Sequence, residues 1–246
     1  MLFDTSLLLA AAFFAGALNA VAGGGSFLTL PALMLTGVPA ICANATGTLA
    51  LLPGYLAGAW GFRHDIRPPP GLTARTLIAA SLVGGATGAT LLLLTSESAF
   101  RRVVPWLLLL ATLAFALGPR WMEKRSSAVP HPALALLGVF GVTAYGGYFN
   151  GGVGILLLAL WGLLGQNHLH AMNGLKNQVS ALLTAIASGL YILGGLIAWR
   201  EAMLMMGAAL LGGYVGARLS KRLPTLWLRR GIVMTGLTMS VAFFAR

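Results

Sequence analysis

Charged residues, and acidic residues above all, are scarce in this sequence. Only 9% of its 246 residues are charged, and 16 Lys and Arg stand against five Asp and Glu. A soluble domain usually carries about 25% charged residues, so a surface facing water could not be covered here. With 58% hydrophobic residues and a mean hydropathy of +0.85, the sequence predicts a protein surrounded mostly by lipid.

Groups of residues that support catalysis or metal binding are also lacking. Cysteine occurs once, as Cys42, and no Cys/His cluster has metal-ligand spacing, so we expect no structural metal and no cofactor. We expect no carboxylate proton relay in the membrane, no catalytic residues and no enzyme, because no paired acids or Ser/His/Asp layout occurs. All five acids lie at the ends of apolar stretches or in loops: Asp4, Asp65, Glu97, Glu123 and Glu201.

The net charge of +11 raises the question of nucleic-acid binding. No basic stripe with interleaved aromatic residues accompanies it, so we expect no nucleic-acid partner. In a membrane protein, positive charge collects in cytoplasmic loops and sets the orientation. We therefore expect the bilayer as partner, with homodimerisation left open.

Apolar stretches long enough to cross or enter a bilayer fill most of the chain. They predict an all-α polytopic transmembrane bundle. Its first repeat spans residues 1–118, a cytoplasmic linker spans 119–131, and its second repeat spans 132–246. The stretches are 6–36, 38–60, 72–95, 99–118, 132–164, 168–199, 201–217 and 225–245.

Two of these stretches exceed 30 residues, and each is interrupted near its middle by glycine. Gly23-Gly24-Gly25-Ser26 lies in the first, and Asn150-Gly151-Gly152-Val153-Gly154 lies in the second. Spaced glycines in membrane helices often serve close packing. Contiguous glycines flanked by Asn and Ser, at about 1 kcal/mol each against alanine, favour a broken helix instead.

The two interruptions stand in similar surroundings. Asn44 follows the first by 19 residues and Asn173 follows the second by 21, counting from Gly25 and Gly152. Ala50-Leu51-Leu52 and Ala181-Leu182-Leu183 also correspond. We interpret this layout as an internal repeat of about 130 residues.

Loop charges distinguish two topologies. If all eight stretches cross the membrane, eight basic residues lie on one side and seven on the other. If the two interrupted stretches are hairpins that return to their own side, the division is eleven against four. The positive-inside rule favours the hairpins. Each half is then a hairpin plus three crossings, the halves are inverted, and both termini face outward.

Lys176 is the exception to this charge pattern, because it lies about two turns into the apolar stretch 168–199. It could snorkel to the interface, but Asn173, Asn177 and Ser180 share its helical face and favour a binding site. Half-helix N-termini after the glycines would add N–H groups and positive dipole ends, a combination that suits a small oxyanion. The candidate substrate-binding residues are Asn19, Gly23, Gly24, Gly25, Ser26, Asn44, Thr46, Thr48, Asn150, Gly151, Gly152, Asn173, Lys176 and Asn177.

Histidine gives a candidate for coupling. His168 and His170 flank the start of the stretch that holds Lys176 and could couple proton movement to transport. The simpler interpretation is that they sit at the membrane interface.

The motifs around the first interruption resemble a known family. Asn19-Ala-Val-Ala-Gly-Gly-Gly-Ser26-Phe-Leu-Thr-Leu-Pro31 and Ala43-Asn-Ala-Thr-Gly-Thr48 look like the first-half signature of the sulfite exporter TauE/SafE family. The second half, with Asn150-Gly-Gly152 and Lys176, is similar to that family's repeat. The resemblance implies a multi-pass transporter of the bacterial inner membrane that moves sulfite, sulfonates or other small organic anions, usually as an exporter.

The leading hypothesis is therefore a secondary transporter of a small sulfur-containing or carboxylate anion, working by alternating access at the interface of the repeats. An uncoupled, channel-like anion pathway is the alternative, because no buried carboxylate is available for coupling. An intramembrane enzyme or assembly factor is the third class.

Overall fold

All secondary structure in the described part of the chain is α-helical. The computed structural model describes residues 2–21, 23–123, 131–166 and 168–219 and the positions 234, 237, 238 and 241. Most of the expected stretch 225–245 and most of the expected linker lie outside the described residues. The helices are α1 (Leu2–Val21), α2 (Ser26–Leu35), α3 (Ala40–Gly61), α4 (Ala74–Leu93), α5 (Glu97–Glu123), α6 (Pro132–Tyr148), α7 (Val153–Leu163), α8 (Leu169–Leu193) and α9 (Trp199–Leu219).

Both long apolar stretches are broken where the glycines predicted it. α1 and α2 are separated around Gly23, whose φ is +84°, and α6 and α7 around Gly152, whose φ is +73°. Asn150 has a φ of 56° and is the one described non-glycine residue with a positive φ. Because this region is open mainly to glycine and asparagine, the sequence dictates where each helix stops.

The half-helices after the breaks are too short to cross a bilayer. α2 has 10 residues and α7 has 11, which makes each about 15 Å long, half of a hydrocarbon core of about 30 Å. Three described helices are long and apolar enough to cross: Phe3–Ala20, Ala40–Gly61 and Ala74–Leu93.

Loops gather at two ends of the bundle. The Gln166 side-chain amide donates to the carbonyls of Arg67, at 2.8 Å, and Pro68, at 3.2 Å. A Cβ added at Gly71 would lie 3.6 Å from Pro132 Cγ. We call this end, with residues 62–73, 131–132, 164–166 and 168, the basic end.

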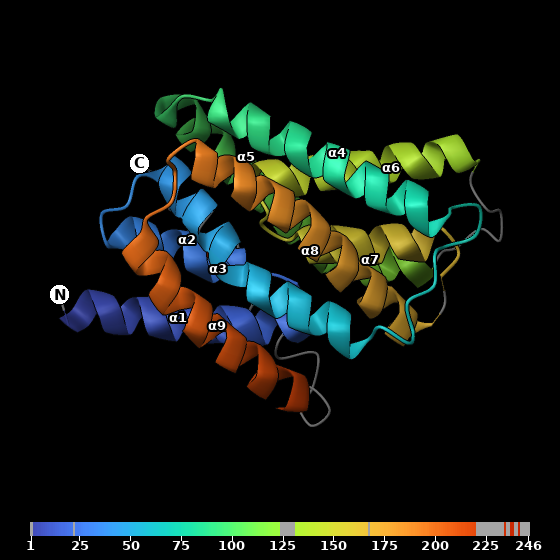
Figure 1. Cartoon of the computed structure of the whole chain (residues 1–246), viewed down its shortest axis with the longest axis horizontal. Helices are drawn as coiled ribbons and strands as arrows, with labels where there is room; N and C mark the ends of the chain where they lie inside the picture. The colour runs from blue at the N-terminus through green and yellow to red at the C-terminus, as the bar shows by residue number, and fades with distance from the viewer. Residues whose placement is uncertain are drawn as a thin grey trace.

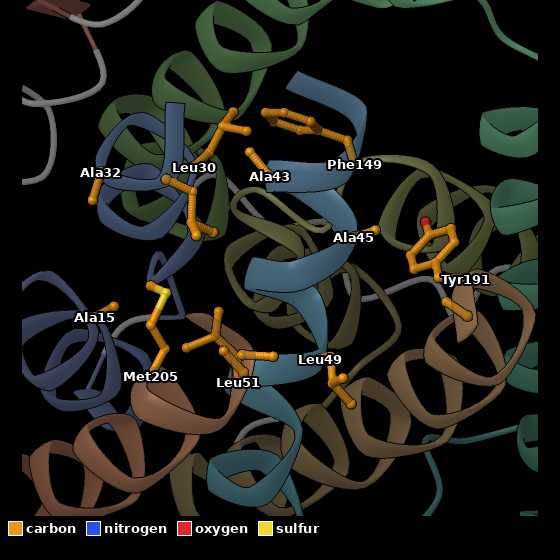
Figure 2. Close-up of a cluster of buried hydrophobic side chains, with 14 of the residues drawn as sticks. Ala15, Leu30, Ala32, Ala43, Ala45, Leu49, Leu51, Phe149, Tyr191 and Met205 are labelled. Atoms are coloured by element: carbon orange, nitrogen blue, oxygen red, sulfur yellow. The ribbon is translucent and has the colours of Figure 1, made fainter. Parts of the chain in front are cut away.

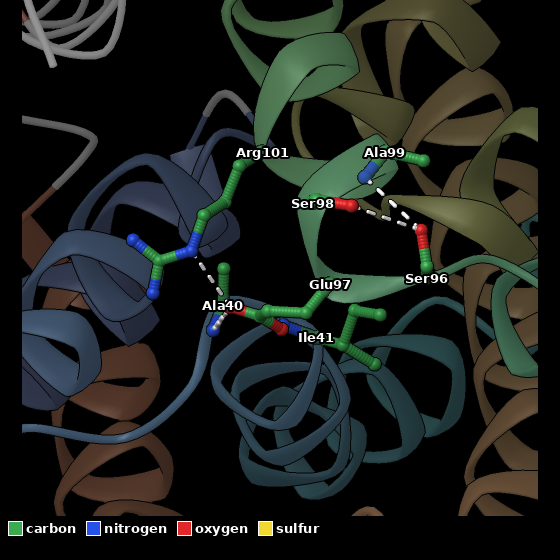
Figure 3. Close-up of polar contacts among 7 residues, drawn as sticks. All are labelled: Ala40, Ile41, Ser96, Glu97, Ser98, Ala99 and Arg101. Atoms are coloured by element: carbon green, nitrogen blue, oxygen red, sulfur yellow. Dashed lines mark hydrogen bonds and ion pairs between the residues drawn. The ribbon is translucent and has the colours of Figure 1, made fainter.

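Residues 36–40, 94–97 and 194–198 form the opposite end. There the Ala198 N–H donates to Thr46 Oγ1 at 3.0 Å. The Glu97 carboxylate accepts from the N–H groups of Ala40, at 2.7 Å, and Ile41, at 3.0 Å, and also binds Arg101 at 2.9 Å (Figure 3). Glu97 thus supplies the acceptor that the first turn of α3 lacks after Pro39.

The two ends confirm the hairpin arrangement of the broken helices. The loop after α2 lies at the opposite end, where α3 begins, and the loop after α7 lies at the basic end, where α8 begins. Each hairpin therefore returns to the end from which its first helix starts (Figure 1). Which end faces the cytoplasm stays a prediction from loop charge.

The helix pairs of the two halves correspond. α1 packs along α9 as α6 packs along α4, α3 packs on α9 as α8 packs on α4, and α3 and α8 pack on each other. In Figure 1, α1 and α9 run from left to right, whereas α4 and α6 run from right to left. The inverted relation of the two halves and their boundaries stay predictions.

Small residues allow these pairs to approach closely. A Cβ added at Gly212 would lie 2.6 Å from the Phe13 carbonyl carbon, and one at Gly216 would lie 2.5 Å from Ala17 Cα. On α4, a Cβ at Gly84 would lie 2.9 Å from the Phe140 carbonyl oxygen. Gly84 and Gly88, and likewise Gly212 and Gly216, have the small-xxx-small spacing of membrane helix pairs.

α3 runs through the centre of the apolar core. Figure 2 shows its Ala43, Ala45 and Leu49 surrounded by side chains of α2, α8 and α9. Large apolar side chains also cover the outside of the bundle, with Phe14 61%, Val83 58% and Leu211 64% exposed. An apolar exterior over an apolar core is the pattern of a bundle solvated by lipid.

Candidate functional site

The two breaks meet inside the bundle. A Cβ added at Gly23 would lie 2.8 Å from Gly154 Cα, and one at Gly154 would lie 2.9 Å from Gly23 Cα. Any side chain at either position would push the two backbones apart. The breaks, about 130 residues apart in the sequence, therefore form one region.

Lys176 lies in this region. Its side chain is 0% exposed, and a Cβ added at Gly154 would lie 3.3 Å from its Cδ. Its ammonium donates to the Asn19 carbonyl oxygen at 3.4 Å. That carbonyl belongs to the last turn of α1, where the helix dipole is negative. The structure thus places the lysine against the first break, away from the interface.

The Asn19 side chain bridges the first break through its hydrogen bonds. Its Oδ1 accepts from the Gly25 N–H at 3.4 Å and from the Tyr55 hydroxyl at 3.5 Å. Asn19 is 6% exposed and Tyr55 2%. The end of α1, the start of α2 and the middle of α3 are thereby joined around the Lys176 ammonium.

Neutral side chains hold the second break. The Asn44 amide donates to the Tyr148 carbonyl at 2.9 Å, and the Tyr145 hydroxyl donates to the Gly151 carbonyl at 2.6 Å. The Tyr191 hydroxyl donates to the Gly147 carbonyl. Two of these bonds satisfy carbonyls at the C-terminus of α6, those of Gly147 and Tyr148, and the third satisfies the Gly151 carbonyl within the break.

Asn150 belongs to the second break and is bonded to a residue of the first. The Ser26 hydroxyl donates to its carbonyl at 3.4 Å and links α2 to the second break. Its side chain is 1% exposed, and in the described residues neither Oδ1 nor Nδ2 has a hydrogen-bond partner. A buried amide in this state can still donate to and accept from a ligand.

The structure brings only part of the predicted site together. Asn19, Gly23, Gly25, Ser26, Asn150 and Lys176 are joined by the contacts above, and Asn44 adjoins them through Tyr148. Gly24 and Gly151 lie within the two breaks, and a Cβ at Gly152 would meet Ala111 and Phe27.

Other predicted site residues lie farther along the helices. Thr46 accepts the Ala198 N–H at the opposite end, and the Thr48 hydroxyl donates to the Asn44 carbonyl of its own helix at 2.7 Å. Asn177 packs against Gly58 of α3. Asn173 lies one turn nearer to the basic end than Lys176.

The two histidines lie at the basic end. His168 precedes α8 and is exposed, and His170 is exposed and lies 6.0 Å from the Phe62 ring, measured between centroids. His170 is six residues before Lys176, about 9 Å along the helix axis. Their role in proton coupling stays a prediction.

Carboxylates lie away from this site. Asp4 and Glu201 are in the first turns of α1 and α9, Glu97 and Glu123 are at the two ends of α5, and Asp65 is in the loop after α3. In the described part of the chain, the Asn19 carbonyl is the polar partner of the Lys176 ammonium. The site therefore carries one positive charge without a neutralising acid.

Sequence reasoning missed the tyrosines that support the breaks. Tyr55, Tyr145 and Tyr191 are apolar residues by composition, and no local pattern shows that their hydroxyls reach backbone carbonyls or Asn19 of other segments. Gly154 was seen as part of the second break, but its contact with Gly23 depends on tertiary packing.

Two broken helices that meet inside a helical bundle define a polytopic membrane protein of the transporter class. A family model described as "Sulfite exporter TauE/SafE" matches residues 8–243. The chain belongs to the sulfite exporter TauE/SafE family.

Relatives from three bacteria extend this assignment. The chain is 31% identical over 247 residues to the "Probable membrane transporter protein YfcA" of Escherichia coli (strain K12), covering 95% of this chain and 88% of the relative. It is 30% identical over 222 residues to a "Probable membrane transporter protein" of Haemophilus influenzae, covering 87% and 84%. A Sinorhizobium relative, "Probable membrane transporter protein ORF9", is 25% identical over 250 residues, covering 98% and 92%.

Proposed function

We propose that this membrane transporter carries a small oxyanion, namely sulfite, an organosulfur anion such as a sulfonate, or a small carboxylate. The observation that carries the proposal is the Lys176 ammonium, which is fully buried and bound to the Asn19 carbonyl, with no carboxylate beside it among the described residues. A buried charge without an opposite charge is costly, so an anion that binds there is stabilised. The unpaired Asn150 amide adds a donor next to the same breaks.

The pairing of helices supports alternating access as the mechanism. The two hairpins enter from opposite ends and touch through Gly23 and Gly154. Movement of one half against the other around this contact would open the site to one end at a time. We propose export from a bacterial inner membrane, with the basic end in the cytoplasm as loop charge predicts.

An uncoupled anion pathway is the second candidate, because the carboxylates lie at helix ends and in a loop. Flux in proteoliposomes separates the two. A transporter coupled to protons accumulates anion when a pH gradient is imposed, whereas an uncoupled pathway only equilibrates it. An intramembrane enzyme would move none of the tested anions.

Lys176→Met tests the site itself. We expect sulfite or sulfonate flux to fall by about 100-fold, because losing one partner of a buried charged pair costs about 3 kcal/mol. The anion should also no longer raise the melting temperature. The control is Arg200→Gln, which removes an exposed positive charge at the opposite end. Wild-type flux in Lys176→Met, with Arg200→Gln also active, would remove Lys176 from the site.

A further inference from the structure

Three buried hydroxyls on α8 have no partner in the described part of the chain. Ser180 and Thr184 are 0% exposed and Ser188 is 2% exposed. Their side-chain oxygens make no hydrogen bond with any described group. Buried hydroxyls in native proteins normally have a hydrogen-bond partner. These three therefore indicate that a ligand or water supplies the partner that the protein chain does not.

Buried hydroxyls on α4, α5 and α6 behave differently. Ser81 donates to the Leu77 carbonyl at 2.6 Å, Thr112 to Leu108 at 2.6 Å, and Thr143 to Val139 at 2.8 Å. Each uses the carbonyl four residues earlier in its own helix, the usual solution for Ser and Thr in membrane helices. The same carbonyls exist on α8, but its three hydroxyls make no hydrogen bond with them.

The three positions continue the row that starts at Lys176. Residues 176, 180, 184 and 188 follow one another at intervals of four, so successive side chains lie about 6 Å apart along the axis and within a sector of about 120°. Along the helix axis the row extends about 18 Å from the backbone of Lys176 toward the opposite end, near which α8 stops at Leu193.

The other central helix has no such row. On α3, Thr48 binds the Asn44 carbonyl, and the positions four and eight residues later are Leu52 and Leu56. From Thr48 toward the basic end, α3 therefore carries apolar side chains at the positions that continue this row.

We propose that Ser180, Thr184 and Ser188 line a hydrated path along which a small oxyanion passes between the Lys176 site and the opposite end of the bundle. The identity of the anion in this path rests on the proposed function, whereas the presence of water in the path does not depend on it. Hydroxyls can donate to an anion and accept from water, and they carry no charge. They would therefore bind an oxyanion weakly enough to release it, as conduction requires.

Cysteine accessibility tests the path directly. In a Cys42→Ala background, Ser180→Cys, Thr184→Cys and Ser188→Cys are made singly in the full chain and reconstituted. Ser81→Cys and Thr112→Cys are matched controls, since their hydroxyls are equally buried but bound to their own helices. Ser98→Cys, exposed at the opposite end, marks the face from which the reagent acts.

A membrane-impermeant sulfonated methanethiosulfonate is added from the face that labels Ser98→Cys. We expect the three path cysteines to react at least about tenfold faster than the two controls, because thiol reactivity requires water and ionisation. Sulfoacetate, which does not consume the reagent, should slow the reaction at Ser180→Cys. Melting curves show which variants are folded.

Two results separate this proposal from the proposed function. If the path cysteines react no faster than Ser81→Cys and Thr112→Cys in folded protein, the path is wrong even where Lys176→Met abolishes flux. If they react fast while Lys176→Met transports normally, the path stands and the proposed anion site is wrong.

Discussion

The two helix breaks are alike in position but are held by different chemistry. At the first break, a charged group holds the end of α1: the Lys176 ammonium on the Asn19 carbonyl. At the second break, neutral groups hold the end of α6: the hydroxyls of Tyr145 and Tyr191 and the amide of Asn44. The two half-helices that follow the breaks are similar in length, and the side chains that hold the breaks make them unequal.

This difference indicates which hairpin responds to the substrate. An anion that pairs with Lys176 competes with the Asn19 carbonyl, so binding changes the hold on the first break. The bonds at the second break do not involve the Lys176 ammonium, so an anion that pairs with it does not compete with them. We infer that the stability of the α1–α2 hairpin depends more strongly on the anion than that of the α6–α7 hairpin, which meets the anion through the Asn150 amide alone.

The contact between the breaks gives the largest expected effect. Gly23→Ala places a Cβ 2.8 Å from the Gly154 backbone and does so at a φ of +84°. Strain and overlap together should lower the free energy of unfolding by about 3 kcal/mol and abolish transport. Melting temperature and flux measure both effects.

Two glycine variants act as controls for that result. Gly37 has a φ of +89° and nothing within 4 Å of an added Cβ, so Gly37→Ala introduces backbone strain without steric overlap. Gly141 has neither strain nor a neighbour within 4 Å, so Gly141→Ala should be neutral. A Gly23→Ala protein as stable as Gly37→Ala would show that the breaks do not need to touch.

Hydrogen exchange compares the two breaks in one experiment. Sulfite or sulfonate should change the exchange of amides in residues 18–21 and 23–28 by about tenfold, equivalent to 1.4 kcal/mol, and change that of residues 146–154 by less. In Lys176→Met, neither segment should respond. Equal changes at both breaks would mean that the anion does not act through the first hairpin alone.

Removing a neutral bond from the second break should affect stability and spare affinity. Tyr145→Phe deletes the donor to the Gly151 carbonyl and should destabilise the protein by about 1–2 kcal/mol. The dissociation constant of the anion, measured by thermal shift, should stay within about threefold, less than 1 kcal/mol. Tyr214→Phe, on an exposed side chain of α9, is the control, and a large loss of affinity in Tyr145→Phe would contradict the division between the breaks.

The smallest effect is expected outside both breaks. Glu97→Ala removes the acceptor for the first N–H groups of α3 and should cost about 1 kcal/mol. Flux per folded molecule should not change, since Glu97 lies at the opposite end. Ser98→Ala, at the next position, controls for changes in the loop before α5.

The sequence was sufficient for the class of structure and for the two breaks. Scarce charge and long apolar stretches dictate a bilayer environment. The glycines at 23–25 and 151–152 stop their helices locally because they permit backbone conformations that other residues resist. Loop charge was enough to predict hairpins, and the loop contacts at the two ends confirm them.

The sequence predicted less well which residues belong to the candidate site. Asn19, Asn150 and Lys176 could be named from residue type and spacing, whereas Thr46 and Thr48 share their motif but bind elsewhere. Which face of α3 meets the breaks depends on how α3 crosses α8. Local sequence does not encode that crossing.

By itself the sequence determined a lipid-solvated helical bundle with two interruptions and one lysine within an apolar stretch, because composition and backbone preference act locally. Only the tertiary structure decided that Gly23 rests on Gly154, that the lysine binds the first break, and that tyrosines hold the second. The first two contacts join residues more than 100 positions apart, and packing of the whole bundle selects them.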